Sequence, residues 1–199
     1  MEKRSINFEL RAKKDSRTIF GTATVFNSSY DMGWYDEEMS PESLNEADMK
    51  DVVALFNHDM NMVLARTSSG TLKLNVTGDA MEYEFEAPNT TLGNDLLEMV
   101  KRGDVYQSSF AFTVETEDWQ ERKGMKPKRV IRSIKKVYDV SPVTYPANPD
   151  TMVAKRSYEA TKEIDKDLQT IIDISVKSEI NIQNETRRNA LHLLNLKTK

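Results

Sequence analysis

Alternation of apolar and polar residues along the first 155 residues is the feature that most constrains the fold. β-Branched and aromatic residues take every second place in several stretches, a period typical of half-buried strands. These stretches are INFELRA (6–12), RTIFGTATVF (17–26), TLKLNVT (71–77), MEYEFEA (81–87) and QSSFAFTVE (107–115). Gly78 and Asp79, between the third and fourth stretches, predict a β-hairpin turn. The pattern therefore predicts a mainly β domain.

One segment, TTLGNDLLEMVKRGD (90–104), departs from this alternation and predicts a short helix. Thr90 or Thr91 is a suitable N-cap, and Gly103 is a suitable stop. Apolar residues follow at helical spacing: Leu92, Leu96, Leu97 and Val100. Closely spaced strands with a few helices predict an α+β fold, a closed or nearly closed antiparallel β-barrel decorated by helices.

The composition changes after Arg156, where glycine and proline disappear and Lys, Glu, Asp and Asn become frequent. Apolar residues recur there at helical spacing, namely Ile164, Leu168, Ile171, Ile172 and Val176. We expect a domain over residues 1–155 and a charged amphipathic helical tail over 156–199, broken near INIQNE (180–185) and resumed at ALHLLNL (190–196). Such a tail either packs on the domain surface or is a partner-binding or removable segment.

The overall charge and the missing cysteines exclude several classes of function. With 28 basic and 32 acidic residues the net charge is -4, so we expect neither a nucleic-acid nor a membrane partner. The absence of cysteine excludes thiolate nucleophiles and zinc sites built on sulfur, and we expect no metal or organic cofactor. No apolar run approaches about 20 residues and no signal peptide is visible, which predicts a soluble intracellular protein.

Histidine is scarce, which limits the choice of a general base. A serine nucleophile needs a base within hydrogen-bonding reach, and imidazole suits that role near neutral pH. The chain has 2 histidines, His58 and His192, and His192 lies in the polar tail. His58 follows the apolar run DVVALFN (51–57) and is the better candidate. A single histidine at the end of a strand is, however, more often structural.

The other members of such a site are harder to choose from the residues alone. Ser108 and Ser109 lie in one strand pattern, so their side chains point to opposite faces, and spacing does not select either. Asp139 stands among apolar residues and either faces solvent or has a buried partner. If it contacts His58, it would orient the imidazole ring for catalysis.

Several motifs, in order, resemble the tailed-bacteriophage prohead (capsid maturation) serine protease family, which is similar in fold to the herpesvirus assemblin proteases. They are GTATVFN (21–27), EEMSPESL (37–44), DVVALFNHD (51–59), VLARTSSGTLKL (63–74), NDLLEMVKRGDVYQSSFAF (94–112) and VYDVSPVTYPANPDT (137–151). Together these motifs cover most of residues 20–155. The ordered set is more specific than any one of its members.

The resemblance implies a role for each candidate residue. His58 stands in the NHD element of the family and would be the general base. Ser109 would be the nucleophile because it begins SFAF, in which Ala111 stands where glycine is usual. Asp139 would be the third member, at a position where glutamate is common. Arg66, in the ART element, would help to stabilise the oxyanion, with a strand-end salt bridge as its alternative role.

The resemblance further implies a serine endopeptidase that cleaves the major capsid protein or a scaffold protein, and also itself. It would act inside the immature capsid, or prohead, in the host cytoplasm, without a cofactor. The resemblance also implies possible self-association, which no residue of this sequence indicates by itself. One alternative is a noncatalytic β-barrel module for capsid assembly or scaffold binding. Another is a hydrolase in which His58 and Asp59 activate water, although we expect Asp59 to point elsewhere on a continuing strand.

Overall fold

The structure is a computed structural model that divides the chain into two compact units. It describes residues 1–6, 10–145, 154–172 and 174–177. The units are Met1–Val153 and Ala154–Lys199. The predicted domain over 1–155 and tail over 156–199 stay predictions, because residues 146–153 lie outside the described part.

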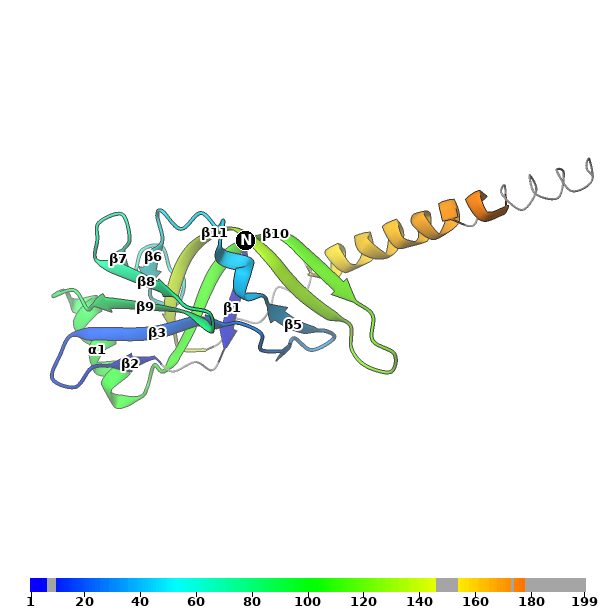
Figure 1. Cartoon of the computed structure of the whole chain (residues 1–199). Helices are drawn as coiled ribbons and strands as arrows, with labels where there is room; N and C mark the ends of the chain where they lie inside the picture. The colour runs from blue at the N-terminus through cyan, green and yellow to red at the C-terminus, as the bar shows by residue number, and fades with distance from the viewer. Residues whose placement is uncertain (7–9, 146–153, 173, 178–199) are drawn as a thin grey trace, which may run out of the picture. The chain divides into compact units, whose positions relative to one another are not determined.

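The second unit is helical over residues 154–172 and 174–177 (Figure 1). The apolar side chains predicted for one face of this helix are all exposed: Ile164, Leu168, Ile171, Ile172 and Val176. The expected break at 180–185, the resumed helix at 190–196 and His192 lie outside the described residues. Within the described ranges, no helix is both long enough and apolar enough to cross a membrane.

The first unit consists mainly of strands. Its elements are β1 (Glu2–Ile6), β2 (Arg11–Ala12), β3 (Thr18–Val25), β4 (Tyr30–Asp31), β5 (Asp36–Met39), the 3-10 helix η1 (Pro41–Leu44), β6 (Val53–Leu55), β7 (Val63–Arg66), β8 (Leu72–Val76), β9 (Ala80–Glu86), α1 (Thr91–Arg102), β10 (Gln107–Gln120) and β11 (Lys128–Val143). The strands predicted over 17–26, 71–77, 81–87 and 107–115 are confirmed, as is the β8–β9 hairpin. The stretch 6–12 instead spans the end of β1 and all of β2, and residues 7–9 lie outside the described part.

The predicted helix is confirmed together with both of its ends. The side chain of Thr90 accepts a hydrogen bond from the backbone N–H of Gly93. Gly103 follows the last turn with φ of 81°, a left-handed conformation that glycine adopts without strain. Leu96, Leu97 and Val100 form the buried face of α1, as the spacing predicted. Local signals were sufficient for this element.

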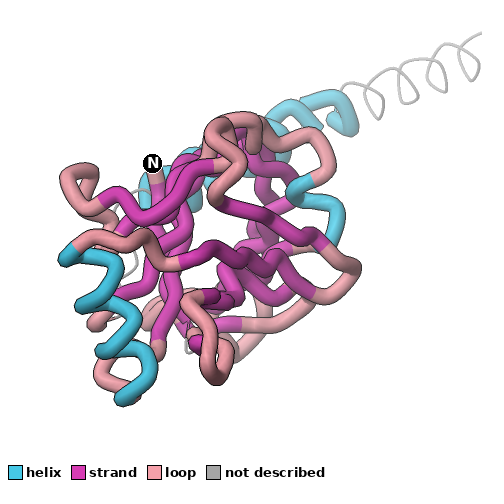
Figure 2. The backbone as a smooth tube through the Cα atoms, turned by 90° about the vertical axis from the view of Figure 1, so that its left-hand side faces the viewer, coloured by secondary structure: helices cyan, strands magenta, loops and turns pink. Residues whose placement is uncertain are grey.

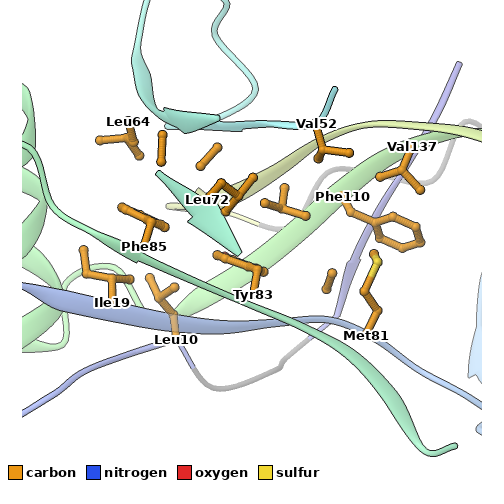
Figure 3. Packing of buried hydrophobic residues seen from close by; sticks show 14 of the residues in the cluster. Leu10, Ile19, Val52, Leu64, Leu72, Met81, Tyr83, Phe85, Phe110 and Val137 are labelled. Carbon is orange, nitrogen blue, oxygen red and sulfur yellow. The ribbon is translucent and has the colours of Figure 1, made fainter. Parts of the chain in front are cut away.

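Two sheets enclose the core of the first unit. One has the strand order β1-β10-β11-β5-β4, with β6 also paired to β11 and β7 paired to β6, and the other has the order β2-β3-β9-β8. Figure 2 shows the strands in the centre of this unit with the loops around them. Ile19, Tyr83 and Phe85 of the four-stranded sheet share one buried cluster with Phe110 and Val137 of the seven-stranded sheet (Figure 3).

The mixed α+β class, mostly strands, is confirmed, but the predicted closed antiparallel barrel is wrong. The two sheets are separate and open, and within the described residues they end at β1, β4, β7, β2 and β8. β11 is antiparallel to β10 but parallel to both β5 and β6. Alternation determines which face of a strand is buried, whereas strand order depends on long-range pairing that alternation alone does not specify. The sequence pattern therefore did not decide closure.

Candidate active site

The paired strands β10 and β11 place four small or polar residues on one face of the seven-stranded sheet. Ser109 lies opposite Ser141, and Ala111 lies opposite Asp139. Residues two apart on a strand share a face, so these four residues form a compact patch. The intervening Phe110 points to the other face and belongs to the hydrophobic core. The same segment thus supports the core on one side and a polar site on the other.

A β-bulge puts Asp139 on this face. Ala111 pairs with Asp139 and Phe112 pairs with Val137, so Tyr138 has no partner across the ladder. Strict alternation would place Val137 and Asp139 on the same face. The extra residue separates them, so Val137 enters the hydrophobic core while Asp139 faces the patch.

The two adjacent serines point in opposite directions, as predicted. The Ser108 hydroxyl lies 2.9 Å from the hydroxyl of Tyr83, on the core side. The Ser109 Oγ lies 2.7 Å from Nε2 of His58. Both serines are fully buried. The structure therefore separates the two candidates, and it brings only Ser109 to the histidine.

His58 reaches the patch from a strained turn after β6. Asn57 and His58 have φ of 53° and 57°, left-handed values that cost most non-glycine residues roughly 1–2 kcal/mol, although asparagine adopts them more readily than most. The backbone N–H of Asn57 donates to the carbonyl of Pro142 at 3.0 Å. Its side-chain Oδ1 accepts from the backbone N–H of Thr144 at 2.9 Å. These bonds tie the turn to the end of β11, and β6 itself ends at Leu55 rather than continuing through His58.

The imidazole of His58 connects the carboxylate to the serine. Its Nδ1 lies 2.6 Å from Oδ1 of Asp139, while its Nε2 contacts Ser109. The His58 and Asp139 side chains are only 5% and 8% exposed. A ring that donates from Nδ1 to a carboxylate presents Nε2 as an acceptor for the serine proton. Removing that proton from a hydroxyl is the first step of serine catalysis.

The Ser109 hydroxyl has a second acceptor. β1 pairs with β10 so that Ser5 lies opposite Ser109. The Ser109 Oγ donates to the backbone carbonyl of Arg4 at 2.8 Å. A hydroxyl has one proton. Donation to Arg4 and donation to His58 are therefore mutually exclusive.

Asp59 is not part of this arrangement. Its Oδ1 accepts hydrogen bonds from the backbone and side-chain nitrogens of Asn61, at 2.8 and 3.0 Å. It points away from the site as predicted, although it does so in a turn and not on a continuing strand. Both ring nitrogens of His58 are already occupied by Asp139 and Ser109.

Arg66, at the end of β7, lies outside the hydrogen-bonded group. It donates from Nε and Nη2 to the two oxygens of Asp51, each at 2.6 Å, and its side chain is 49% exposed. These hydrogen bonds hold the pKa of Asp51 well below its ordinary value. Among the described residues, no hydrogen bond joins Arg66 to Ser109 or His58. The structure thus shows the strand-end salt bridge, and the oxyanion role stays a prediction.

Sequence reasoning did not single out Ser141, although it lies in one of the matching motifs. Its hydroxyl donates to Oδ1 of Asp139 at 2.7 Å. The spacing of two residues from Asp139 on a predicted strand was the available signal. In the described part of the chain, no three His, Asp or Glu side chains gather closely enough to hold a metal ion.

Comparison with known proteins identifies the family. A family model described as caudovirus prohead serine protease matches residues 6–164, which is most of the chain. Neither a curated protein nor a solved structure matches the chain, so the expected likeness in fold to the herpesvirus assemblin proteases stays a prediction. The family match covers all the residues of the hydrogen-bonded group on β10, β11 and the turn after β6. The chain therefore belongs to the caudovirus prohead serine protease family.

Proposed function

We propose that this protein is a serine endopeptidase of capsid maturation, with Ser109 as nucleophile, His58 as general base and Asp139 as the group that orients the base. The observation that carries the proposal is the continuous hydrogen-bonded series from Asp139 through both nitrogens of His58 to Ser109. Family membership independently supports a serine peptidase.

The proposed reaction is acyl transfer. Nε2 of His58 takes the hydroxyl proton as Oγ of Ser109 attacks a peptide carbonyl carbon, and a tetrahedral intermediate forms. The imidazolium then gives its proton to the departing amine, which leaves an acyl-enzyme. Water, deprotonated by the same ring, hydrolyses the ester and restores Ser109. Asp139 stabilises the imidazolium, and each hydrogen bond to the oxyanion would contribute about 3–4 kcal/mol.

The proposed substrates follow from the family. They are the major capsid protein or a scaffold protein, cleaved inside the immature capsid in the host cytoplasm, and the protease chain itself. The helical second unit, with its exposed apolar residues, is a candidate for recruitment to the scaffold and for removal by self-cleavage.

Access to the nucleophile depends on movement of the surrounding chain. Ser109 is fully buried, and its strand is paired on one side by β1 and on the other by β11. A peptide carbonyl therefore reaches Oγ only after a covering segment shifts. When the Arg4 carbonyl leaves, the Ser109 proton has His58 as its remaining acceptor. A protease that is closed at rest fits an activity confined to assembly.

Coexpression with the major capsid protein of the same phage tests the proposal. The parent chain should produce a shortened capsid protein or a shortened protease by intact mass, and Ser109→Ala should produce neither. Ser108→Ala is the matched control, because its hydroxyl contacts Tyr83 and not His58. Cleavage that persists in Ser109→Ala would favour a hydrolase that activates water. No cleavage by the parent would favour the noncatalytic assembly module.

A further inference from the structure

We propose that Ser141 is a positioning residue, which holds the Asp139 carboxylate in the orientation that His58 needs. The inference rests on the proposed function of the same site and adds a residue to it. Oδ1 of Asp139 receives two hydrogen bonds, from Nδ1 of His58 at 2.6 Å and from Oγ of Ser141 at 2.7 Å. One oxygen is therefore held from two directions.

The position of Ser141 explains how it reaches Asp139. Both residues lie on β11 and are separated by one residue, so their side chains share a face. Ser141 is fully buried, so its hydroxyl needs a hydrogen-bond partner inside the protein. Its one proton goes to the carboxylate.

Asp139 needs such a restraint because its carboxylate rotates easily. The terminal torsion of an aspartate is broad and roughly two-fold, unlike the staggered torsions of an alkyl chain. The bond to His58 alone would let the carboxylate turn with the ring. Ser141 supplies a second, fixed donor to the same oxygen. Partners of this kind, one step removed from the reacting atoms, set the orientation of the groups they contact.

The other neighbours of Asp139 do not replace this bond. Ala111 lies opposite Asp139 on β10, and Val53 lies opposite it on β6, and neither side chain carries a donor. Ser109, opposite Ser141, directs its Oγ to His58 and the Arg4 carbonyl. Within the described ranges, Ser141 and His58 are the side chains that hydrogen-bond the carboxylate.

The first test compares three variants in coexpression with the capsid protein. Ser141→Ala should slow cleavage about tenfold, as expected when a hydrogen bond of about 1.4 kcal/mol no longer aligns the base. Ser141→Thr keeps the hydroxyl and should recover most of the rate. Ser108→Ala removes another fully buried serine hydroxyl of the same strand pair and should cleave within about twofold of the parent.

The second readout needs no cleavage. The Nδ1–H proton of His58, in a short bond to a carboxylate, should give a low-field proton NMR signal. The chain has 2 histidines, and His192→Asn removes the other one for assignment. In Ser141→Ala the signal should shift or disappear by exchange with water. The signal should stay in place in Ser108→Ala. A general loss of stability would not explain a change that occurs in Ser141→Ala alone.

The outcomes separate this inference from the proposed function. If Ser141→Ala cleaves at the parental rate, or if its Nδ1–H signal is unmoved, Ser141 is not a positioning residue. If Ser141→Thr is as slow as Ser141→Ala, packing and not the hydroxyl is responsible. If Ser109→Ala still cleaves, the proposed function fails, whatever Ser141 does. If the parent chain does not cleave, an NMR signal that responds to Ser141→Ala would show the geometry without the reaction.

Discussion

Two largely buried polar clusters include side chains from the long paired strands β10 and β11, whose backbones are labelled in Figure 1. The serine–histidine cluster, which we propose to be catalytic, consists of His58, Ser109 and Asp139 together with Ser141. The ionic cluster consists of Glu2, Arg4, Glu37, Glu117 and Arg129. Both clusters remove polar groups from water, but they differ in how completely their members satisfy one another.

The ionic cluster is fully paired. Arg129, 1% exposed, donates to Glu2, Glu37 and Glu117, and Arg4 donates to Glu2 and Glu37. Burial acts to lower the pKa of Arg129, but the hydrogen bonds and charge of its carboxylates outweigh burial and raise that pKa. Every buried charge has an opposite charge in contact, which offsets its desolvation. Such a cluster holds β1, β5, β10 and β11 together and has no proton to transfer.

The serine–histidine cluster contains a hydroxyl proton that has more than one possible acceptor. The hydroxyl of Ser109 contacts two acceptors, the Arg4 carbonyl and His58, and donates to one at a time. His58 in turn lies between a hydroxyl and a carboxylate, which differ in proton affinity. Complete pairing therefore stabilises a buried polar group, whereas competition for one proton prepares such a group to react.

The largest expected effect separates activity from stability. Asp139→Asn should slow cleavage by about 10⁴-fold, or about 5.4 kcal/mol, because an amide does not hold the His58 ring in the reactive tautomer. The free energy of unfolding in urea should change by about 1 kcal/mol, since the two side chains have similar shapes. A loss of unfolding free energy as large as the loss in activation free energy would show that Asp139 serves stability, as the ionic cluster does, and would contradict the contrast between the two clusters.

Arg129→Met should have the next largest effect, and on stability. Removing one partner of a buried ion pair typically costs about 3–5 kcal/mol, and here the change removes a cation that pairs with three carboxylates. Urea unfolding measures the loss. Arg132→Met is the control on the same strand. Its side chain is 48% exposed and pairs with Asp118, so it should change stability by about 0.5 kcal/mol or less.

Asn57→Ala should destabilise the protein by about 1–2 kcal/mol, because alanine tolerates the left-handed backbone poorly and lacks the bond to Thr144. Cleavage should also slow, since the turn is no longer tied to β11. Asn57→Gly also lacks the side-chain amide, but glycine adopts the left-handed backbone without strain. This variant should therefore be about 1 kcal/mol more stable than Asn57→Ala. Equal unfolding free energies for the two variants would argue against strain at this turn.

The ionic cluster also predicts a response to acid. Burial acts to raise the pKa of Glu2, but hydrogen bonds and charge from Arg129 and Arg4 outweigh it, so the pKa lies below its ordinary 4.5. Glu2 therefore contributes stability above pH 4.5 that is lost as the pH falls through the folded value. Glu2→Gln should show a flatter fall of unfolding free energy below pH 4.5 than the parent. Parallel curves would exclude this contribution.

The smallest expected effect lies beside the ionic cluster. The Tyr35 hydroxyl is buried and has no hydrogen-bond partner among the described residues, so Tyr35→Phe should change stability by about 0–1 kcal/mol, in the stabilising direction. Burial, aided by the charge of Glu37, raises the pKa of Tyr35 from 10.0 to about 12. The parent should therefore lose stability between pH 10.0 and 12 relative to the variant, measured by thermal unfolding.

The residues alone predicted features that depend on near neighbours. The helix α1, an N-cap at Thr90 or Thr91 and the stop at Gly103 followed from spacing and residue type, and the structure selects Thr90 as the cap. The opposite directions of Ser108 and Ser109 followed from the geometry of one strand. The choice of Ser109, His58 and Asp139 came from the resemblance to the prohead proteases, since spacing did not bring the three together.

The remaining features of the site depend on which strands pair, so they became visible only in the three-dimensional structure. Backbone N–H and C=O groups are nearly the same at every residue, so alternation sets the face of each strand but not its partner. The parallel pairing of β6 with β11, the bulge at Tyr138 and the left-handed turn at His58 together aim one imidazole at Ser109 and Asp139. The ionic cluster joins Glu2 to Arg129, which lie 127 residues apart in the sequence. The order of residues specifies which face of each strand is polar or apolar and supplies the candidate reactive groups, and the pairing of distant strands brings those groups together.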